Sequence, residues 1–186
     1  NPPNEGGRDK LILAVGRFFV GTHNKKHDVM IKTFRELCEG GLRGWEFHLV
    51  GGLHHNKASK VYIEELRRIA HDLPIYFHTD AAPKVLASLQ DRAQFFWHAA
   101  GYQEDPTLYP ENFEHFGMST VEAMARGIVP IVVRAGGQPE IVNDGENGFL
   151  WDDTTQLKAR TLELIANPTR HAAMGKAARE RACDFD

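Results

Sequence analysis

Short apolar runs alternate with segments in which apolar residues recur at helical spacing, and this alternation continues along most of the chain. The apolar runs, each followed by glycine or polar residues, predict strands over residues 11–15, 47–50, 75–77, 93–97, 128–133 and 148–151. The helical spacing predicts helices over residues 26–39, 59–70, 83–89, 119–126, 139–142, 155–166 and 169–183. Repeated strand–helix units of this length predict an α/β fold: a Rossmann-like parallel sheet with helices on both faces.

Ligands of such sheets bind beside the carboxyl ends of the strands. That rule directs attention to the residues that directly follow each predicted strand. They are Gly16-Arg17, Gly51-Gly52, His78-Thr79, the loop of residues 98–118, and residues 134–137. We expect the binding site among these segments.

Composition narrows the class of protein. The chain has 186 residues, 42% of them hydrophobic and 25% charged, which suits one soluble domain over residues 11–186. Residues 1–10 are polar and contain proline and glycine, as is typical of a linker or a cut end. The net charge of -3 gives no reason to expect nucleic acid or an anionic membrane as a partner.

The cysteines and the lengths of the apolar runs both agree with a cytoplasmic protein. Cys38 and Cys183 have no metal or redox spacing, so we expect free thiols in a reducing compartment, the cytoplasm. No apolar run approaches the roughly 20 residues of a membrane span.

Gly16, Arg17 and Lys25 follow the first predicted strand. Arginine offers a bidentate fork and lysine a point charge, and together they suit a diphosphate. The alternative is that both are solvated surface charges, as most charged side chains are. Lys25 lies at a predicted helix N-terminus, where a cation opposes the helix dipole, and this conflict favours a functional role.

The segment from Glu114 to Glu122 places two carboxylates on either side of a helix start. Gly117 and Met118 precede this helix, and free backbone N–H groups there would form an anion cradle, or the segment is an ordinary helix start. Glu114 would accept hydrogen bonds from sugar hydroxyls, or it is a loop carboxylate facing solvent.

Glu122 has two interpretations. Ser119-x-x-Glu122 matches a capping box, in which the serine caps the helix and the glutamate reaches back to the serine N–H. The other interpretation is that Glu122 accepts hydrogen bonds from ribose hydroxyls beside the phosphate cradle. The local sequence leaves both open.

Several other kinds of site are disfavoured. His23 and His27 are four residues apart, but no cysteine or glutamate completes a known ligand spacing, so we expect no metal site. The chain has no Walker A pattern, no Gly-x-Gly-x-x-Gly and no Gly-x-Ser-x-Gly. These absences disfavour a P-loop ATPase, a dinucleotide-dependent dehydrogenase and a serine hydrolase.

Taken together, the motifs resemble the C-terminal, donor-binding half of a group 1 (family 4) retaining glycosyltransferase of GT-B fold. The pieces occur in family order and cover nearly the whole chain. They are Val15-Gly16-Arg17-Phe18 with Lys25, Leu49-Val50-Gly51-Gly52, Glu114-x7-Glu122, Val129-Pro130-Ile131-Val132, residues 136–142 and Gly148-Phe149-Leu150.

The resemblance implies a role for each residue. Arg17 and Lys25 would hold the donor diphosphate and stabilise charge on the leaving nucleotide. Glu114 would bind the donor sugar, the amides near Phe116 to Ser119 would contact phosphate or sugar, and Glu122 would bind ribose. A sugar would pass from a nucleotide diphosphate sugar to an acceptor with retention, and no metal or other cofactor would be needed because these cations and the helix end supply the electrostatics.

This chain also departs from the family pattern. His115 replaces a frequent glycine, Thr79 stands where a glycine often follows the third strand, and the loop of residues 101–113 is longer than usual. An N-terminal domain that supplies the acceptor site is expected as the partner, so this half should bind donor weakly and be inactive alone. The alternatives are a GT-B-like sugar phosphorylase, a nucleotide-sugar epimerase, and a non-catalytic nucleotide-binding module.

Overall fold

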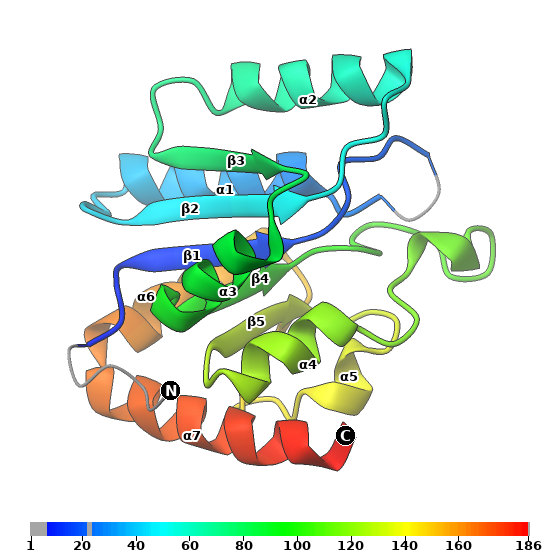
Figure 1. Ribbon diagram of the computed structural model, residues 1–186. Coiled ribbons are helices and arrows are strands. Elements are labelled where there is room, and N and C mark those ends of the chain that lie inside the picture. The colour runs from blue at the N-terminus through cyan, green and yellow to red at the C-terminus, as the bar shows by residue number, and fades with distance from the viewer. Residues whose placement is uncertain (1–6, 22–23, 186) are drawn as a thin grey trace.

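The computed structural model describes residues 7–21 and 24–185 and contains one six-stranded parallel sheet (Figure 1). The strand order is β3-β2-β1-β4-β5-β6. The strands are β1 (Leu11–Val15), β2 (Glu46–Gly51), β3 (Ile75–Thr79), β4 (Phe95–His98), β5 (Val129–Val133) and β6 (Phe149–Trp151). The predicted α/β, Rossmann-like parallel sheet is confirmed.

Helices cover both faces of this sheet (Figure 1). One face packs against α1 (His27–Glu39), α2 (Lys57–Ile69) and α6 (Thr154–Ala166), and the other against α3 (Pro83–Arg92), α4 (Met118–Ala125) and α5 (Gln138–Ile141). The long helix α7 (Pro168–Ala182) contributes to both cores, and two short 3₁₀ helices are η1 (Pro110–Asn112) and η2 (Cys183–Phe185). Within the described residues, no helix combines the length and apolarity that crossing a bilayer requires.

Successive side chains of each buried strand point to opposite faces of the sheet, and they form one hydrophobic core on each face. Ile12 and Ala14 point to the first, α1 side of the sheet, whereas Leu11 and Leu13 point to the second, α4 side. All four side chains are almost fully buried. The strands are therefore apolar on both faces, as expected of a parallel sheet covered by helices.

The strand order reverses direction between β1 and β4. These two strands are neighbours, with Ile12 opposite Phe95 and Leu13 opposite Phe96. The chain leaves β1 toward β2 on one side and leaves β4 toward β5 on the other. A crevice at such a topological switch point is where open α/β sheets bind ligands. We therefore expect the binding site at the carboxyl ends of β1 and β4.

Two element boundaries differ from the predictions in ways that matter for the site. The fourth strand runs from Phe95 to His98, because β4 pairs with β5 as far as His98 opposite Val132, so the predicted range of 93–97 is wrong. The first helix begins at His27, and Lys26 is a left-handed residue with φ of 54°. Lys26 thus turns the chain between Lys25 and the helix.

The described part of the stretch before β1 lies against the domain. The Arg8 guanidinium donates to the carbonyls of Gln90 and Ala93, at 3.0 and 2.8 Å. The backbone N–H of Asp9 donates to the Arg92 carbonyl at 2.9 Å. These bonds attach residues 8 and 9 to the end of α3.

Candidate functional site at the β1–β4 switch point

Close backbone approaches shape the end of β1. A Cβ on Gly51 would lie 2.0 Å from the Gly16 carbonyl oxygen, and a Cβ on Gly16 would lie 2.7 Å from Lys25 Cγ. Real Cβ atoms do not approach other atoms so closely, so Gly51, which faces rigid backbone, needs glycine, and a side chain at Gly16 would displace the Lys25 side chain. The missing side chains allow β2 to lie against Gly16 and Lys25 to fold back over it.

Lys25 meets Glu114 at this place. The Lys25 ammonium donates to Glu114 Oε2 at 2.6 Å, and the side chains are 17% and 21% exposed. The two predicted site residues come from opposite sides of the switch point, one after β1 and the other before α4. The structure therefore brings them together.

His98, at the end of β4, lies behind Glu114. Its Nε2 is 3.4 Å from Glu114 Oε2, and its Nδ1 is 3.5 Å from the side-chain amide nitrogen of Gln138. The Thr120 hydroxyl donates to Gln138 Oε1 at 3.0 Å, which leaves the amide nitrogen of Gln138 to donate to His98. That arrangement places the His98 proton on Nε2, facing the carboxylate.

Burial and these contacts determine the charge states of His98 and Glu114. Burial lowers the pKa of His98, so the imidazole is neutral near pH 7. The pKa of Glu114 lies well below its usual range, first because of the neighbouring His98 imidazole and then because of Lys25, and these contacts outweigh the opposing effect of burial. Glu114 is therefore a carboxylate, able only to accept hydrogen bonds.

Three polar residues of this arrangement, His98, Gln138 and Thr120, were not predicted from the sequence. Each is almost completely buried although it is polar. A signal was present for His98, a polar residue at the end of a strongly apolar run at the ligand-binding edge of the sheet. Gln138 and Thr120 carried no such signal, since their contact joins two segments 18 residues apart.

Gly136 and Gly137 support Glu114 from behind. A Cβ on Gly136, whose φ is 59°, would lie 2.2 Å from the Glu114 carbonyl oxygen, and one on Gly137 would lie 2.4 Å from the His115 carbonyl oxygen. The Gly137 N–H donates to the Glu114 carbonyl at 2.8 Å. The Gly-Gly pair therefore holds the loop that positions Glu114.

The N-terminus of α4 completes the site. Gly117 is the N-cap, with a left-handed φ of 92° and no side-chain cap, and α4 starts at Met118. The N–H groups of Met118 and Ser119 belong to the first turn and have no intrahelical acceptor. Phe116 and Met118 are 46% and 67% exposed beside this end. Free N–H groups at a helix N-terminus are where anions bind, so the anion cradle stays a prediction at this position.

Ser119 lies inside the first turn of α4, so the capping-box interpretation of Ser119 and Glu122 is wrong. Gly117 occupies the cap position because its left-handed backbone turns the chain into the helix and because a Cβ there would lie 2.9 Å from both Gln138 and Ile141. The side chain of Glu122 is exposed and makes no hydrogen bond or ion pair within the described ranges 7–21 and 24–185.

The remaining predicted cation, Arg17, is not brought into contact with the others. Its side chain is exposed, and no hydrogen bond or ion pair joins it to any residue the structure describes. It directly follows Gly16 at the end of β1, and its part in the site stays a prediction.

The structure describes no group of three or more His, Cys, Asp or Glu side chains that could hold a metal ion, in residues 7–21 and 24–185. Of the histidine pair considered from the sequence, His23 lies outside the described residues. His27 is buried and stacks on Phe18, with ring centroids 4.7 Å apart. Burial lowers the pKa of His27 to about 4, so it is a neutral residue of the core.

Comparison with known families gives a match over most of the chain. The family model described as Glycosyl transferases group 1 matches residues 1–181. A GDP-Man:Man(3)GlcNAc(2)-PP-Dol alpha-1,2-mannosyltransferase of Dictyostelium discoideum is 27% identical over 97% of this chain and 35% of its own length. A D-inositol 3-phosphate glycosyltransferase of Corynebacterium diphtheriae is 33% identical over 95% of this chain and 39% of its own length. The chain thus spans little more than a third of these curated relatives.

Solved structures share the fold. Anabaena Alr3699/HepE, in complex with UDP, matches 95% of this chain and 44% of its own, with a TM-score of 0.75 at 20% identity. The C-terminal domain of LpcC, a group 1 family protein of Francisella tularensis, matches 96% of this chain and 87% of its own, with a TM-score of 0.68 at 17% identity. At these identities the likeness establishes the architecture.

Proposed function

Because this chain belongs to the glycosyl transferases group 1 family, we propose that it is the donor-binding domain of a retaining glycosyltransferase. The donor is a nucleotide diphosphate sugar, and the partner is an N-terminal acceptor domain of the same enzyme. The observation that carries the proposal is the convergence of Lys25, Glu114 and the N-terminus of α4 at the β1–β4 switch point. A cation, a fixed carboxylate and free backbone N–H groups match the phosphates and hydroxyls of such a donor.

Each group has a part in the proposed reaction. The bond between the anomeric carbon and the diphosphate oxygen breaks, a bond from that carbon to an acceptor hydroxyl oxygen forms, and the hydroxyl proton passes to an oxygen of the departing diphosphate. Negative charge grows on the departing diphosphate, where Arg17, Lys25 and the α4 end stabilise it. This electrostatic work comes from the chain itself, so the proposal includes no metal and no other cofactor.

Glu114 orients the sugar in this proposal. Its carboxylate has two oxygens, and Lys25 and His98 both lie beside Oε2, at 2.6 and 3.4 Å. Hydroxyl groups of the donor sugar can donate to Oε1. Glu122, exposed on α4 and not required to cap it, is assigned to the ribose hydroxyls.

Thermal unfolding with added nucleotides tests the donor site. A ligand that binds only the folded state raises the midpoint by mass action. We expect one of UDP, GDP or ADP, or its nucleotide-sugar, to raise the midpoint, and Arg17→Ala and Glu122→Ala to abolish the rise. Glu111→Ala, at a carboxylate outside the site, is the control and should keep it. No rise with any nucleotide at millimolar concentration would contradict donor binding by this chain.

A transfer assay tests the proposed division of labour between the two domains. We expect this chain to bind donor and to transfer no sugar to a saccharide acceptor, because the acceptor domain supplies the other wall of the cleft. Appreciable transfer by the chain alone would contradict this. Release of sugar 1-phosphate from a glycoside in the presence of inorganic phosphate would instead favour the phosphorylase alternative.

A further inference from the structure

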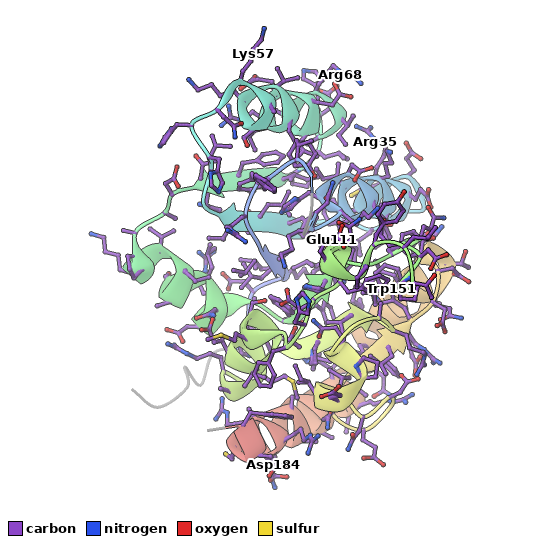
Figure 2. All side chains as sticks on the ribbon, turned by 90° about the vertical axis from the view of Figure 1, so that its right-hand side faces the viewer. Arg35, Lys57, Arg68, Glu111, Trp151 and Asp184 are labelled. Carbon is purple, nitrogen blue, oxygen red and sulfur yellow. The ribbon has the colours of Figure 1, made fainter. Side chains whose placement is uncertain are left out.

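A hollow opens at the carboxyl edge of the sheet, beside the switch-point site. This hollow, the Tyr102 cleft, has a volume of about 530 Å³ and lies between the loop of residues 101–113 and the ends of β5 and β6. Figure 2 faces this edge, with Glu111 marking the loop and Trp151 marking the end of β6. Its volume lies within the roughly 300–1,000 Å³ typical of small-molecule sites.

One wall of the cleft is aromatic. The half-buried Tyr102 ring lies 5.1 Å from the ring of Trp151, which is fully buried and supports it from behind. Phe113 lines the same hollow. The indole N–H of Trp151 is buried and has no acceptor among the side chains and backbone that the structure describes. Aromatic faces of this kind pack against the C–H faces of sugar rings, and an unpaired buried donor is unusual.

The other wall is polar. Gln103 and Asp152 are exposed on the rim of the cleft, and Arg134, which also lines it, is 3.4 Å from Asp152 and 2.7 Å from Asp144. Amide, carboxylate and guanidinium groups pair with hydroxyl groups. A cavity with an aromatic wall and a few polar groups therefore suits a saccharide.

The loop that encloses the cleft is held in place by its own contacts. Lys26 forms an ion pair with Glu104, and Asn112 donates to the other oxygen of Glu104 at 2.9 Å. Glu104 and Asn112 belong to the loop, whereas Lys26 directly follows Lys25 of the switch-point site. The Glu104 contacts therefore preform the cleft and attach it to the loop that carries Lys25.

The cleft lies next to Glu114 but on the opposite side of the sheet from α4. Phe113 directly precedes Glu114, and Gly136, which also lines the cleft, packs against the Glu114 backbone. Tyr102 packs against the α1-side core, whereas the buried face of α4 belongs to the other core. A nucleotide at α4 and a ligand in the cleft would therefore flank Glu114 from two sides.

We propose that the Tyr102 cleft binds a saccharide unit of the acceptor, so that this domain contributes to acceptor selection. The proposal rests on the proposed function, because it takes Glu114 to hold the donor sugar. Acceptor recognition would then be shared with the proposed N-terminal acceptor domain. Tyr102 and Phe113 would stack on the sugar ring, and Gln103 and Asp152 would bind its hydroxyls.

Nuclear magnetic resonance of the ¹⁵N-labelled chain tests the proposal. The indole N–H signal of Trp151, identified by its loss in Trp151→Phe, reports on the cleft, and the amide of Ser119 reports on the donor site. We would titrate separately with maltose, mannobiose and N,N′-diacetylchitobiose, and with UDP and GDP. We expect at least one disaccharide to shift the Trp151 signal saturably and to leave Ser119 unchanged.

Variants sharpen this test. Tyr102→Ala should weaken disaccharide binding by roughly two- to tenfold, a loss of the size expected for one aromatic stacking contact. Tyr102→Phe, which keeps the ring, and Leu108→Ala, on the same loop but outside the cleft, should retain binding. A Tyr102→Ala spectrum that keeps its dispersion would exclude simple unfolding.

The outcomes separate this proposal from the proposed function. Shifts at Ser119 with nucleotide but none at Trp151 with any disaccharide at millimolar concentration would overturn the acceptor site and leave donor binding intact. Disaccharide binding without nucleotide binding would support the cleft and contradict donor binding by this chain. A nucleotide that shifts Trp151 and loses affinity in Tyr102→Ala would make the cleft a base site and overturn the proposal.

Discussion

The ammonium group of Lys25 lies 2.6 Å from Glu114 Oε2, although the two residues are 89 positions apart in the chain. The contact exists because β1 and β4 are neighbours in the sheet, so the segments that follow them emerge side by side. Both side chains are mostly buried, and His98 adds a second contact to the same carboxylate oxygen. This pair is the centre of the proposed donor site.

Removing the Lys25 charge should weaken donor binding more than it weakens the fold. Lys25→Met keeps much of the side-chain volume but removes one charge-assisted hydrogen bond to phosphate, worth roughly 1.5–3 kcal/mol. We expect nucleotide affinity, measured by isothermal titration calorimetry, to fall at least about tenfold. Lys84→Met, the same change on the exposed face of α3, should leave the affinity unchanged. Equal affinities for the two variants would contradict a role for Lys25.

The imidazole of His98 should control the ionisation of Glu114. His98→Phe removes the group that most lowers the pKa of Glu114, so we expect this pKa to rise. The measurement is the pH dependence of the Glu114 carboxyl ¹³C signal. His98→Asn, which retains an N–H donor, is the matched variant and should give a smaller rise. A Glu114 titration that is identical in wild type and His98→Phe would show that the contact has no electrostatic effect.

Gly136 should tolerate a methyl group much less well than another glycine of similar backbone conformation. Gly136→Ala and Gly145→Ala both place alanine at positive φ, 59° and 84°, which costs roughly 1–2 kcal/mol each. Only at Gly136 would the new Cβ meet backbone, 2.2 Å from the Glu114 carbonyl, whereas nothing lies within 4 Å at Gly145. We expect chemical unfolding to show a further loss of about 1–3 kcal/mol for Gly136→Ala.

The Gly136 prediction also has a functional readout. Because the Gly137 N–H and the Glu114 carbonyl are hydrogen-bonded, displacing this loop should weaken nucleotide binding in Gly136→Ala and not in Gly145→Ala. Similar unfolding free energies and affinities for the two variants would mean that the Glu114 loop moves aside without penalty.

Acid should destabilise the domain in part through His27. Burial lowers its folded pKa to about 4, below an unfolded value near 6.5, so the unfolded state binds more protons between these pH values. Stability should therefore fall as the pH drops from about 6.5 to about 4, by up to roughly 3 kcal/mol for this group, and the group has no effect above that window. Lys25, Asp28 and His98 also influence this titration.

The matched variant for this prediction is His27→Phe. It keeps an aromatic ring against Phe18 and cannot titrate. The unfolding free energy of the variant should depend less steeply on pH than that of the wild type between about pH 6.5 and 4. The other buried histidines are present in both proteins, so the difference between the curves isolates His27. Parallel curves would contradict the assignment.

Much of the architecture follows from local pattern. Apolar runs and helical periodicity were enough to predict the α/β sheet, and glycines after strands marked the binding edge, because side-chain burial repeats with the period of each element. The candidates Gly16, Lys25, Glu114 and Gly117 do lie at that edge. The chain by itself thus determined the fold class, the edge of the sheet at which the candidate residues lie and most of those residues.

Only the tertiary structure decided how those residues are joined. The pairing of Lys25 with Glu114, the polar residue His98 behind them and the cleft beside Tyr102 all depend on strand order, which local periodicity does not specify. The capping box failed for a related reason: tertiary contacts of Gly117 with Gln138 and Ile141 place the helix start there instead of at Ser119. Contacts between distant segments are formed by packing, so they become visible only when the sheet is assembled.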